Sequence, residues 1–411
     1  MKKNPFRIYQ YLDRSFYALY TVQFIQNFIQ TAFLLIFNIY LRKNGYSDAQ
    51  AGTFVSLQYL GILVLALPLG IWIRGKKLKP ILWISTLGVP ITSLLLVYAV
   101  PYHQAFWNYS LNLAWGMCFA CLQIVMLPYV MRNVSSHIQT EAIAFMYTNY
   151  SAGQILSGIL VAGATYLLKW SEGDILFALA VGGLIGSGLM FWIKEKELPP
   201  KEQKHSSSLQ NLKHQYDWQK VLITMLPNTM LTVGAGLTFP FMNLFFYNSF
   251  YLDSDGYGIL NTVTAVLVLL STLTIPFIHK RYGFQVSISL TQSIAVGLLV
   301  LLAVTDLFRQ YTWAFYGAWL FFALRQPFMQ SAVPMTRELM MLYVGERNRE
   351  IVSALLSGIR SGSYFFSGLV FSQLRSFQLP YAYIFLMTAG FYAVGVVAYH
   401  RLILAYEGGD V

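Results

Sequence analysis

Charged residues are scarce in this chain of 411 residues. Asp, Glu, Lys and Arg make up 11% of the sequence, 56% of it is hydrophobic, and the mean hydropathy is +0.52. Soluble domains carry about 25% charged residues. Apolar runs of roughly 18 residues or more, long enough to cross a bilayer as a helix, recur along the sequence. This shortage of charge excludes an ordinary soluble protein and predicts an integral membrane protein in contact with the lipid bilayer.

Enzyme and metal-site motifs are also missing. The sequence has no HExxH pattern, no phosphate-binding glycine loop and no pair of CxxC motifs. Its two cysteines, Cys118 and Cys121, lie inside one apolar run, where packing residues are more common than redox pairs. The six histidines fall in expected loops or near helix ends. We therefore expect no enzyme activity, no cofactor, no metal site and no ATP-driven pumping.

Acidic residues are absent from the middle of every apolar run, but arginine is not. Arg325 and Arg360 each lie near the centre of a run of spanning length. An arginine at the centre of a bilayer costs at least about 2.5–3.5 kcal/mol on insertion scales, so such a residue is a functional candidate. No Asp or Glu lies at matching depth in the sequence. We therefore expect a positively charged, water-accessible site in the second half of the chain.

Twelve apolar runs predict an all-α membrane protein with 12 transmembrane helices in two pseudo-symmetric six-helix bundles. The expected spans are 16–41, 50–73, 80–101, 106–131, 142–168, 174–193, 220–247, 257–279, 285–305, 312–336, 350–374 and 381–400. A Pro-Pro step, a serine run and mixed charges indicate an exposed linker at the centre. The predicted domains are an N-terminal bundle (1–193), a cytoplasmic linker (194–219) and a C-terminal bundle (220–411).

Basic residues are divided unevenly between the two sides of this topology. Of the 28 Lys and Arg residues, 21 fall in the tails and even-numbered loops and five in the odd-numbered loops. Because cytoplasmic loops are rich in Lys and Arg, both termini are expected in the cytoplasm. The same distribution accounts for the net charge of +11, so we expect no nucleic-acid partner. The compact sequence with short loops favours a bacterial inner membrane, and we expect a monomer.

The two halves repeat each other, as is common in secondary transporters. Polar residues, prolines and glycines recur in register on either side of the linker. The pairs are Asn38 with Asn243, Asp48 with Asp255, Gly52 with Gly258, Pro68 with Pro276, Pro128 with Pro334, Glu141 with Glu350, and Gly153 with Gly362. Such a repeat favours a transporter over a membrane scaffold.

The 6+6 arrangement, the long central loop and the basic turns after spans 2 and 8 resemble the major facilitator superfamily over essentially the whole chain. The resemblance implies two bundles around a central cavity, with alternating access by rocking of one bundle against the other. The family's loop after span 2 reads Gly-x-Leu-x-Asp-Arg-x-Gly-Arg-Lys, and this sequence keeps the glycine and the first arginine but lacks the Asp. The candidate gating residues are Gly70 and Arg74, Arg281 and Gly283 in the matching turn after span 8, and Glu141 and Glu350 at the cytoplasmic mouths of spans 5 and 11.

Two departures from the family bear on the mechanism. Drug–proton antiporters of the family carry an Arg-x-x-x-Gly pattern in span 4, where this sequence has Asn112 and Gly116. The carboxylates that would relay protons inside the membrane are also missing from the spans. A typical proton-coupled multidrug pump is therefore disfavoured, and the coupling ion stays open, with a proton as one candidate.

Polar faces of the spans supply the candidate binding residues. Arg360 shares a helical face with Ser353, Ser357, Tyr364 and Ser367. Arg325 lies on a mostly apolar face, so it either reaches the cavity or is a packed structural charge. Two guanidinium groups at one depth repel unless an anion lies between them, and carboxylate or phosphate fits their fork-shaped geometry. The candidate substrate-binding residues are Arg360, Arg325, Gln23, Asn27, Gln30, Tyr150, Gln154, Asn228 and Tyr364.

Three hypotheses follow from these patterns. The first is a secondary active transporter of a small organic solute that we expect to be anionic. In the second, the chain is an exporter or flippase of amphipathic drugs or lipids and its two arginines are structural. In the third, it is a membrane receptor or scaffold that does not transport. The amides of span 1 either line a cavity or hold helices together, and the resemblance favours lining, because span 1 lines the cavity in that family.

Overall fold

The computed structural model describes residues 13–73, 76–135, 138–193 and 216–408, and these residues contain helices and no strand. The chain divides into two compact units. The N-terminal unit comprises Met1–Tyr46 and Leu57–Lys204, and the C-terminal unit comprises Ser47–Ser56 and His205–Val411. The first turns of the second helix therefore group with the C-terminal unit, although the rest of that helix belongs to the N-terminal unit.

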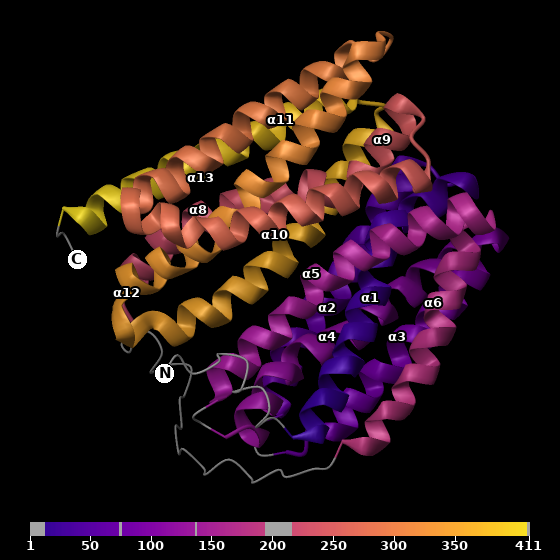
Figure 1. Ribbon diagram of the computed structural model, residues 1–411, viewed down its shortest axis with the longest axis horizontal. Helices are drawn as coiled ribbons and strands as arrows, with labels where there is room; N and C mark the ends of the chain where they lie inside the picture. Colours follow the sequence, from indigo (N-terminus) through magenta and orange to yellow (C-terminus); the bar gives the residue numbers. More distant parts are fainter. Residues whose placement is uncertain (1–12, 74–75, 136–137, 194–215, 409–411) are drawn as a thin grey trace, which may run out of the picture. The chain divides into compact units, whose positions relative to one another are not determined.

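The N-terminal unit contains six long helices, which run side by side (Figure 1). They are α1 (Arg14–Lys43), α2 (Asp48–Trp72), α3 (Lys79–Ala99), α4 (Ala105–Asn133), α5 (Gln139–Gly163) and α6 (Glu172–Ser187). Helix α3 packs against α4 and α6, and α1 packs against α5 and α6. Helices α2 and α4 touch through glycine. A Cβ atom added at Gly116 would lie 2.0 Å from the Gln58 carbonyl oxygen, so only glycine permits this approach.

The C-terminal unit contains α8 (Trp218–Thr238), α9 (Met242–Phe250), α10 (Ser254–Phe284), α11 (Thr291–Leu307), α12 (Thr312–Ser376) and α13 (Tyr381–Glu407). Helix α12 packs against α8, α10 and α11, and α13 packs against α8 and α11. A 3-10 turn at Phe239–Phe241 separates α8 from α9. It contains Pro240, and proline lacks the N–H that a continuous helix needs.

Two glycines break the longest helices of the C-terminal unit. Gly345 interrupts the 65-residue α12 with φ 71° and ψ 170°, and Gly283 interrupts the end of α10 with φ 70° and ψ −167°. These angles are readily accessible only to glycine. Figure 1 shows α12 turning sharply beside its label. Helix α12 is therefore two arms, 312–344 and 346–376, which correspond to predicted spans 10 and 11.

Nine helical segments among the described residues are long and apolar enough to cross a membrane. One of them, Ser254–Leu307, contains both α10 and α11 and so covers two predicted spans. The two arms of α12 are not among the nine. Dividing Ser254–Leu307 at Gly283 and adding the two arms of α12 gives an arrangement that is consistent with the twelve predicted spans.

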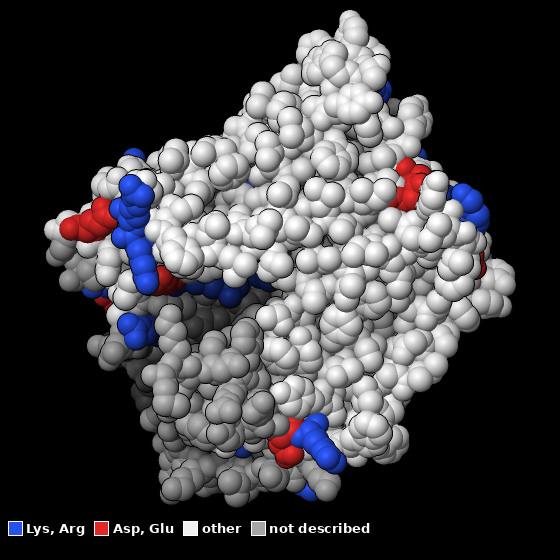
Figure 2. All heavy atoms as spheres, in the orientation of Figure 1, with Lys and Arg blue, Asp and Glu red and all other residues white. Residues whose placement is uncertain are grey.

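Acidic side chains cap the starts of several helices. The Asp13 carboxylate accepts a hydrogen bond from the Arg14 N–H at 2.7 Å, Asp253 accepts one from the Ser254 N–H at 2.7 Å, and Asp217 accepts one from the Lys220 N–H at 3.2 Å. These bonds satisfy N–H groups that have no partner inside the helix. On the face of the molecule in Figure 2, charged side chains form a few small groups and wide areas carry none.

Candidate functional site

The amides predicted on α1 contribute to packing within the N-terminal unit. The Gln23 Oε1 atom accepts a hydrogen bond from the Asn149 Nδ2 atom of α5 at 3.1 Å, and Asn149 also donates to the Tyr20 carbonyl at 3.2 Å. Asn27 and Gln30 are half-buried on the same helix. One hydrogen bond of Gln23 therefore joins α1 to α5. The sequence pattern did not single out Asn149, which supplies that bond.

The other predicted polar residues lie on single helices. In α5, Tyr150 is exposed and its hydroxyl accepts a hydrogen bond from Gln154 Nε2 at 3.4 Å. In α8, Asn228 is half-buried and its carbonyl accepts a hydrogen bond from the Thr232 hydroxyl at 2.6 Å. The two helices belong to different units, and each of these hydrogen bonds lies within one helix.

Arg360 lies on the second arm of α12, and its side chain is exposed. One turn further along, Tyr364 is buried, and its backbone lies against Gly236 of α8. Ser367 is also buried, and its hydroxyl donates to the Val233 carbonyl of α8 at 2.8 Å. The predicted polar face is therefore divided, because Tyr364 and Ser367 pack against α8 whereas Arg360 extends from the packed region.

Arg325 lies on the first arm of α12 and has the opposite environment. Only 2% of the residue is exposed, and its Nη2 atom donates to the Tyr392 hydroxyl of α13 at 3.2 Å. The Tyr392 ring centroid lies 5.6 Å from the guanidinium carbon. The Nε and Nη1 atoms of Arg325 are buried without a hydrogen-bond partner. Of the two alternatives for Arg325, the packed position describes this structure.

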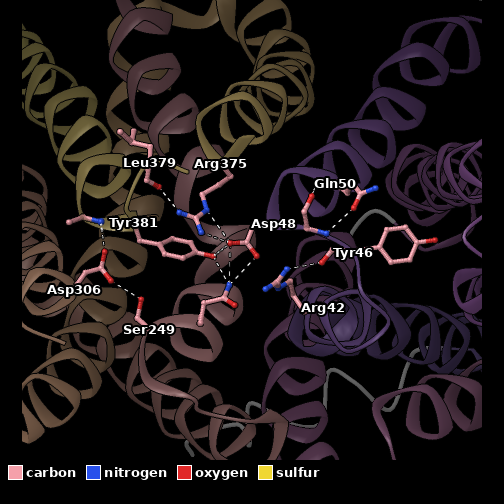
Figure 3. A network of polar contacts seen from close by, with 12 residues as sticks. Arg42, Tyr46, Asp48, Gln50, Ser249, Asp306, Arg375, Leu379 and Tyr381 are labelled. Atoms are coloured by element: carbon pink, nitrogen blue, oxygen red, sulfur yellow. Dashed lines mark hydrogen bonds and ion pairs between the residues drawn. The ribbon is translucent and has the colours of Figure 1, made fainter. Parts of the chain in front are cut away.

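A network of polar contacts surrounds Asp48 at the start of α2, within the C-terminal unit. The Asp48 carboxylate accepts hydrogen bonds from Arg375 Nη2 at 2.7 Å and Arg375 Nε at 3.0 Å, from the Tyr381 hydroxyl at 2.8 Å, and from Asn248 Nδ2 at 3.0 Å. Figure 3 shows Arg375 and Tyr381 pointing toward this carboxylate. The Arg375 guanidinium carbon also lies 4.3 Å from the Tyr381 ring centroid. Asp48 is only 6% exposed, so this is a buried and well-satisfied ion pair.

A second buried carboxylate fixes the position of Tyr381. Asp306, at the end of α11, accepts a hydrogen bond from the Ser249 hydroxyl at 2.7 Å and another from the Ala382 N–H at 2.8 Å. Ala382 is the second residue of α13, so Asp306 holds the start of this helix next to the Asp48 network (Figure 3). Helices α9, α11 and α13 are joined at one point by this carboxylate.

The turn between α1 and α2 has its own anchor in the N-terminal unit. The Tyr46 hydroxyl accepts a hydrogen bond from Asn108 Nδ2 at 2.7 Å and donates to the Val100 carbonyl at 3.0 Å. Burial raises the pKa of the Tyr46 hydroxyl, so the group stays protonated and keeps donating. Arg42 donates to the Tyr46 carbonyl at 2.9 Å. These bonds hold the residue that precedes the first turns of α2.

Comparison with known proteins decides the family. A model of the Major Facilitator Superfamily matches residues 19–368. The chain belongs to the Major Facilitator Superfamily. It is therefore an integral membrane protein of a transporter family that handles small-molecule solutes and is generally non-enzymatic. No curated protein matches the sequence.

Solved structures of superfamily transporters share the fold at low sequence identity. The POT family transporter PepTSo has a TM-score of 0.77 and 10% identity, over 96% of this chain and 99% of that one. A D-xylose–proton symporter has a TM-score of 0.71 and 13% identity, over 93% and 96%. The nucleoside transporter NupG has a TM-score of 0.69 and 15% identity, over 95% and 99%. The last two transport different solutes, D-xylose and nucleosides, so the superfamily fold does not define the solute of this chain.

The residues that the superfamily resemblance marked for gating fall in helix ends and turns. Gly70 lies in the last turn of α2, with open space where a Cβ atom would be. Arg281 is exposed beside the Tyr282 ring, two residues before the break at Gly283. Arg74 and the side chains of Glu141 and Glu350 lie outside the described residues. Their gating roles remain predictions.

The Asp48 network is the feature that the sequence analysis missed. The sequence pattern places Asp48 only in a repeat pair with Asp255, and Arg375 is one of the five basic residues of the odd-numbered loops. A signal was nevertheless present. Asp48 begins span 2 and Arg375 follows span 11, so both lie on the same side of the predicted membrane topology with opposite charge. Few charged residues lie on that side, so these positions favoured an ion pair between Asp48 and Arg375.

Proposed function

We propose that this protein is a secondary active transporter of a small organic solute with a negatively charged group, working by alternating access. The observation that carries the proposal is the exposed guanidinium of Arg360 on the second arm of α12. A charged side chain at this position in a membrane helix is too costly to place in lipid, so its exposed face is expected to meet water. An exposed and permanently positive group beside water is suited to binding an anion.

Carboxylate and phosphate groups are the chemical classes that fit this arginine. The planar guanidinium donates two parallel hydrogen bonds to either group, and the pairing strengthens where water is excluded. The amides and hydroxyl groups of Gln23, Asn27, Gln30, Tyr150, Gln154 and Asn228 are proposed to bind the polar remainder of the solute. A neutral sugar would not need the arginine, so a charged solute fits this set better.

Energy for transport is proposed to come from an ion gradient, and a proton is one candidate. The excess of basic residues in the tails and even-numbered loops supports cytoplasmic termini, and the short loops support a location in a bacterial inner membrane. We propose that the protein acts as a monomer.

A thermal-unfolding screen of the purified protein in detergent tests the proposal. Small carboxylates, organophosphates and lipophilic cations are added to the wild type and to Arg360→Gln. The matched control is Arg309→Gln, which removes one positive charge from an exposed loop position. We expect an anion to raise the unfolding midpoint of the wild type and of the control but not that of Arg360→Gln.

Two results would overturn the proposal. If the anion stabilises Arg360→Gln as strongly as the wild type, Arg360 does not bind the solute. If lipophilic cations or lipids stabilise all three proteins and no anion does, an exporter or flippase of amphipathic compounds replaces the anion transporter. Uptake of the identified anion into proteoliposomes then separates transport from binding by a receptor.

A further inference from the structure

Arg325 is a buried charge whose hydrogen bonds are incomplete. Its exposed fraction is 2%, one nitrogen bonds to the Tyr392 hydroxyl, and two nitrogens have no partner. We propose that the Arg325 guanidinium holds a small inorganic anion of halide size inside the C-terminal unit. This site is separate from the solute site proposed at Arg360, and its argument does not depend on that proposal.

Arginine side chains in proteins carry a positive charge. Moving an ion of this size from water into a protein interior costs several kcal/mol unless an opposite charge and hydrogen bonds compensate. The Tyr392 hydroxyl is a neutral dipole and compensates only part of this cost. A negative charge near Nε and Nη1 would supply the rest.

No carboxylate of the described C-terminal unit takes that place. The unit has two buried carboxylates, Asp48 and Asp306. Asp48 binds Arg375, Tyr381 and Asn248, and Asp306 binds the Ser249 hydroxyl and the Ala382 N–H. Neither of them contacts Arg325. Within the part of the C-terminal unit that the structure describes, the buried carboxylates therefore do not supply the compensating anion.

Packing around Arg325 limits the size of this anion. The Tyr392 ring lies beside the guanidinium and is itself almost fully buried. On α8, Gly234 allows the ring to approach so closely that an added Cβ atom would lie 2.7 Å from it. This close packing favours a small anion over an organic solute. A monatomic anion needs only the two free donor groups, so chloride or bromide is the class that fits.

Thermal unfolding under exchange of the anion tests the site. The purified protein is measured in sodium gluconate and then with chloride or bromide added at constant ionic strength. We expect a saturable rise of the wild-type midpoint by about 2 °C or more, because a ligand that binds only the folded state stabilises it. Arg325→Met should lose this rise, whereas Arg309→Met, which removes an exposed arginine, should keep it.

Crystals grown in bromide provide a second measurement that needs no variant. An anomalous peak within hydrogen-bonding distance of Arg325 Nε or Nη1 would support the site even if Arg325→Met does not fold. The proposal fails if the density there is explained by water, or if halide shifts the midpoints of the wild type and Arg325→Met equally. It also fails if an organic anion displaces the halide competitively, because Arg325 would then be part of the solute site. Arg360→Gln should retain the halide effect, which distinguishes failure here from failure of the proposed function.

Discussion

Asp48 and Arg325 are buried charges in the same unit, and they differ in how completely their polar atoms are hydrogen-bonded. Asp48 accepts hydrogen bonds from three side chains, one of which carries the opposite charge. Arg325 has one hydrogen bond, to a neutral hydroxyl, and two donor atoms without a partner. A saturated buried charge contributes to holding the fold together. A buried charge whose donor atoms lack partners destabilises the fold, and its presence is explained if an ion binds there.

The largest effect on stability is expected for Asp48→Asn. The substitution keeps the shape of the side chain but leaves Arg375 without its counter-charge, and breaking a buried ion pair costs about 3–5 kcal/mol. The free energy of unfolding, measured by denaturant titration in detergent, should fall toward that range. Asp255→Asn is the matched control, because Asp255 occupies the equivalent repeat position and bonds to the adjacent Gly256 N–H. Equal losses for the two variants would mean that the network contributes nothing special.

A smaller loss is expected for Tyr381→Phe. The change removes one hydrogen bond to the charged Asp48 and keeps the ring beside Arg375, so the free energy of unfolding should fall by about 1.5–3 kcal/mol. Tyr383→Phe, two residues along α13 and 51% exposed, should have almost no effect. Combined with Asp48→Asn, Tyr381→Phe should add less than its separate loss, because both act on one network. Simple additivity would contradict this interpretation of the contacts.

The sequence predicted the environment of the chain better than the partners of its polar groups. Long apolar runs require helices across a bilayer, and the interruption at Pro240 follows from the chemistry of proline. The Asp48–Arg375 pair lies 327 residues apart, and no local pattern encodes such a contact. For Arg325 the sequence identified an isolated charge, but its partner is one of 28 tyrosines, and helical periodicity gives a face and not a neighbour. Contacts of this kind depend on how the helices pack.

Replacing Arg325 is expected to leave the free energy of unfolding unchanged or to raise it, in contrast to the losses at Asp48 and Tyr381. Arg325→Met replaces an incompletely paired charge with an apolar side chain of similar length. Without halide, the free energy of unfolding should change by less than about 1 kcal/mol or rise, as happens when buried ions are replaced by packed apolar groups. Arg375→Met should instead lose about 3 kcal/mol, because it leaves Asp48 without its cation. If Arg325→Met were as destabilising as Arg375→Met, Arg325 would have a partner that satisfies it.

The smallest effect on stability is expected for Arg360→Gln, although its effect on transport should be the largest. Arg360 is exposed, and Tyr364 and Ser367 on the next turns contact α8, so replacing Arg360 leaves those contacts in place. The unfolding midpoint without solute should match that of the wild type, while uptake of the anionic solute into proteoliposomes should fall at least tenfold. Arg360→Lys separates charge from geometry, because lysine keeps the charge but cannot donate the paired hydrogen bonds of a guanidinium. Partial uptake by the lysine variant would indicate that attraction alone brings the solute in. A lowered unfolding midpoint in both variants would instead mean that Arg360, like Asp48, stabilises the fold.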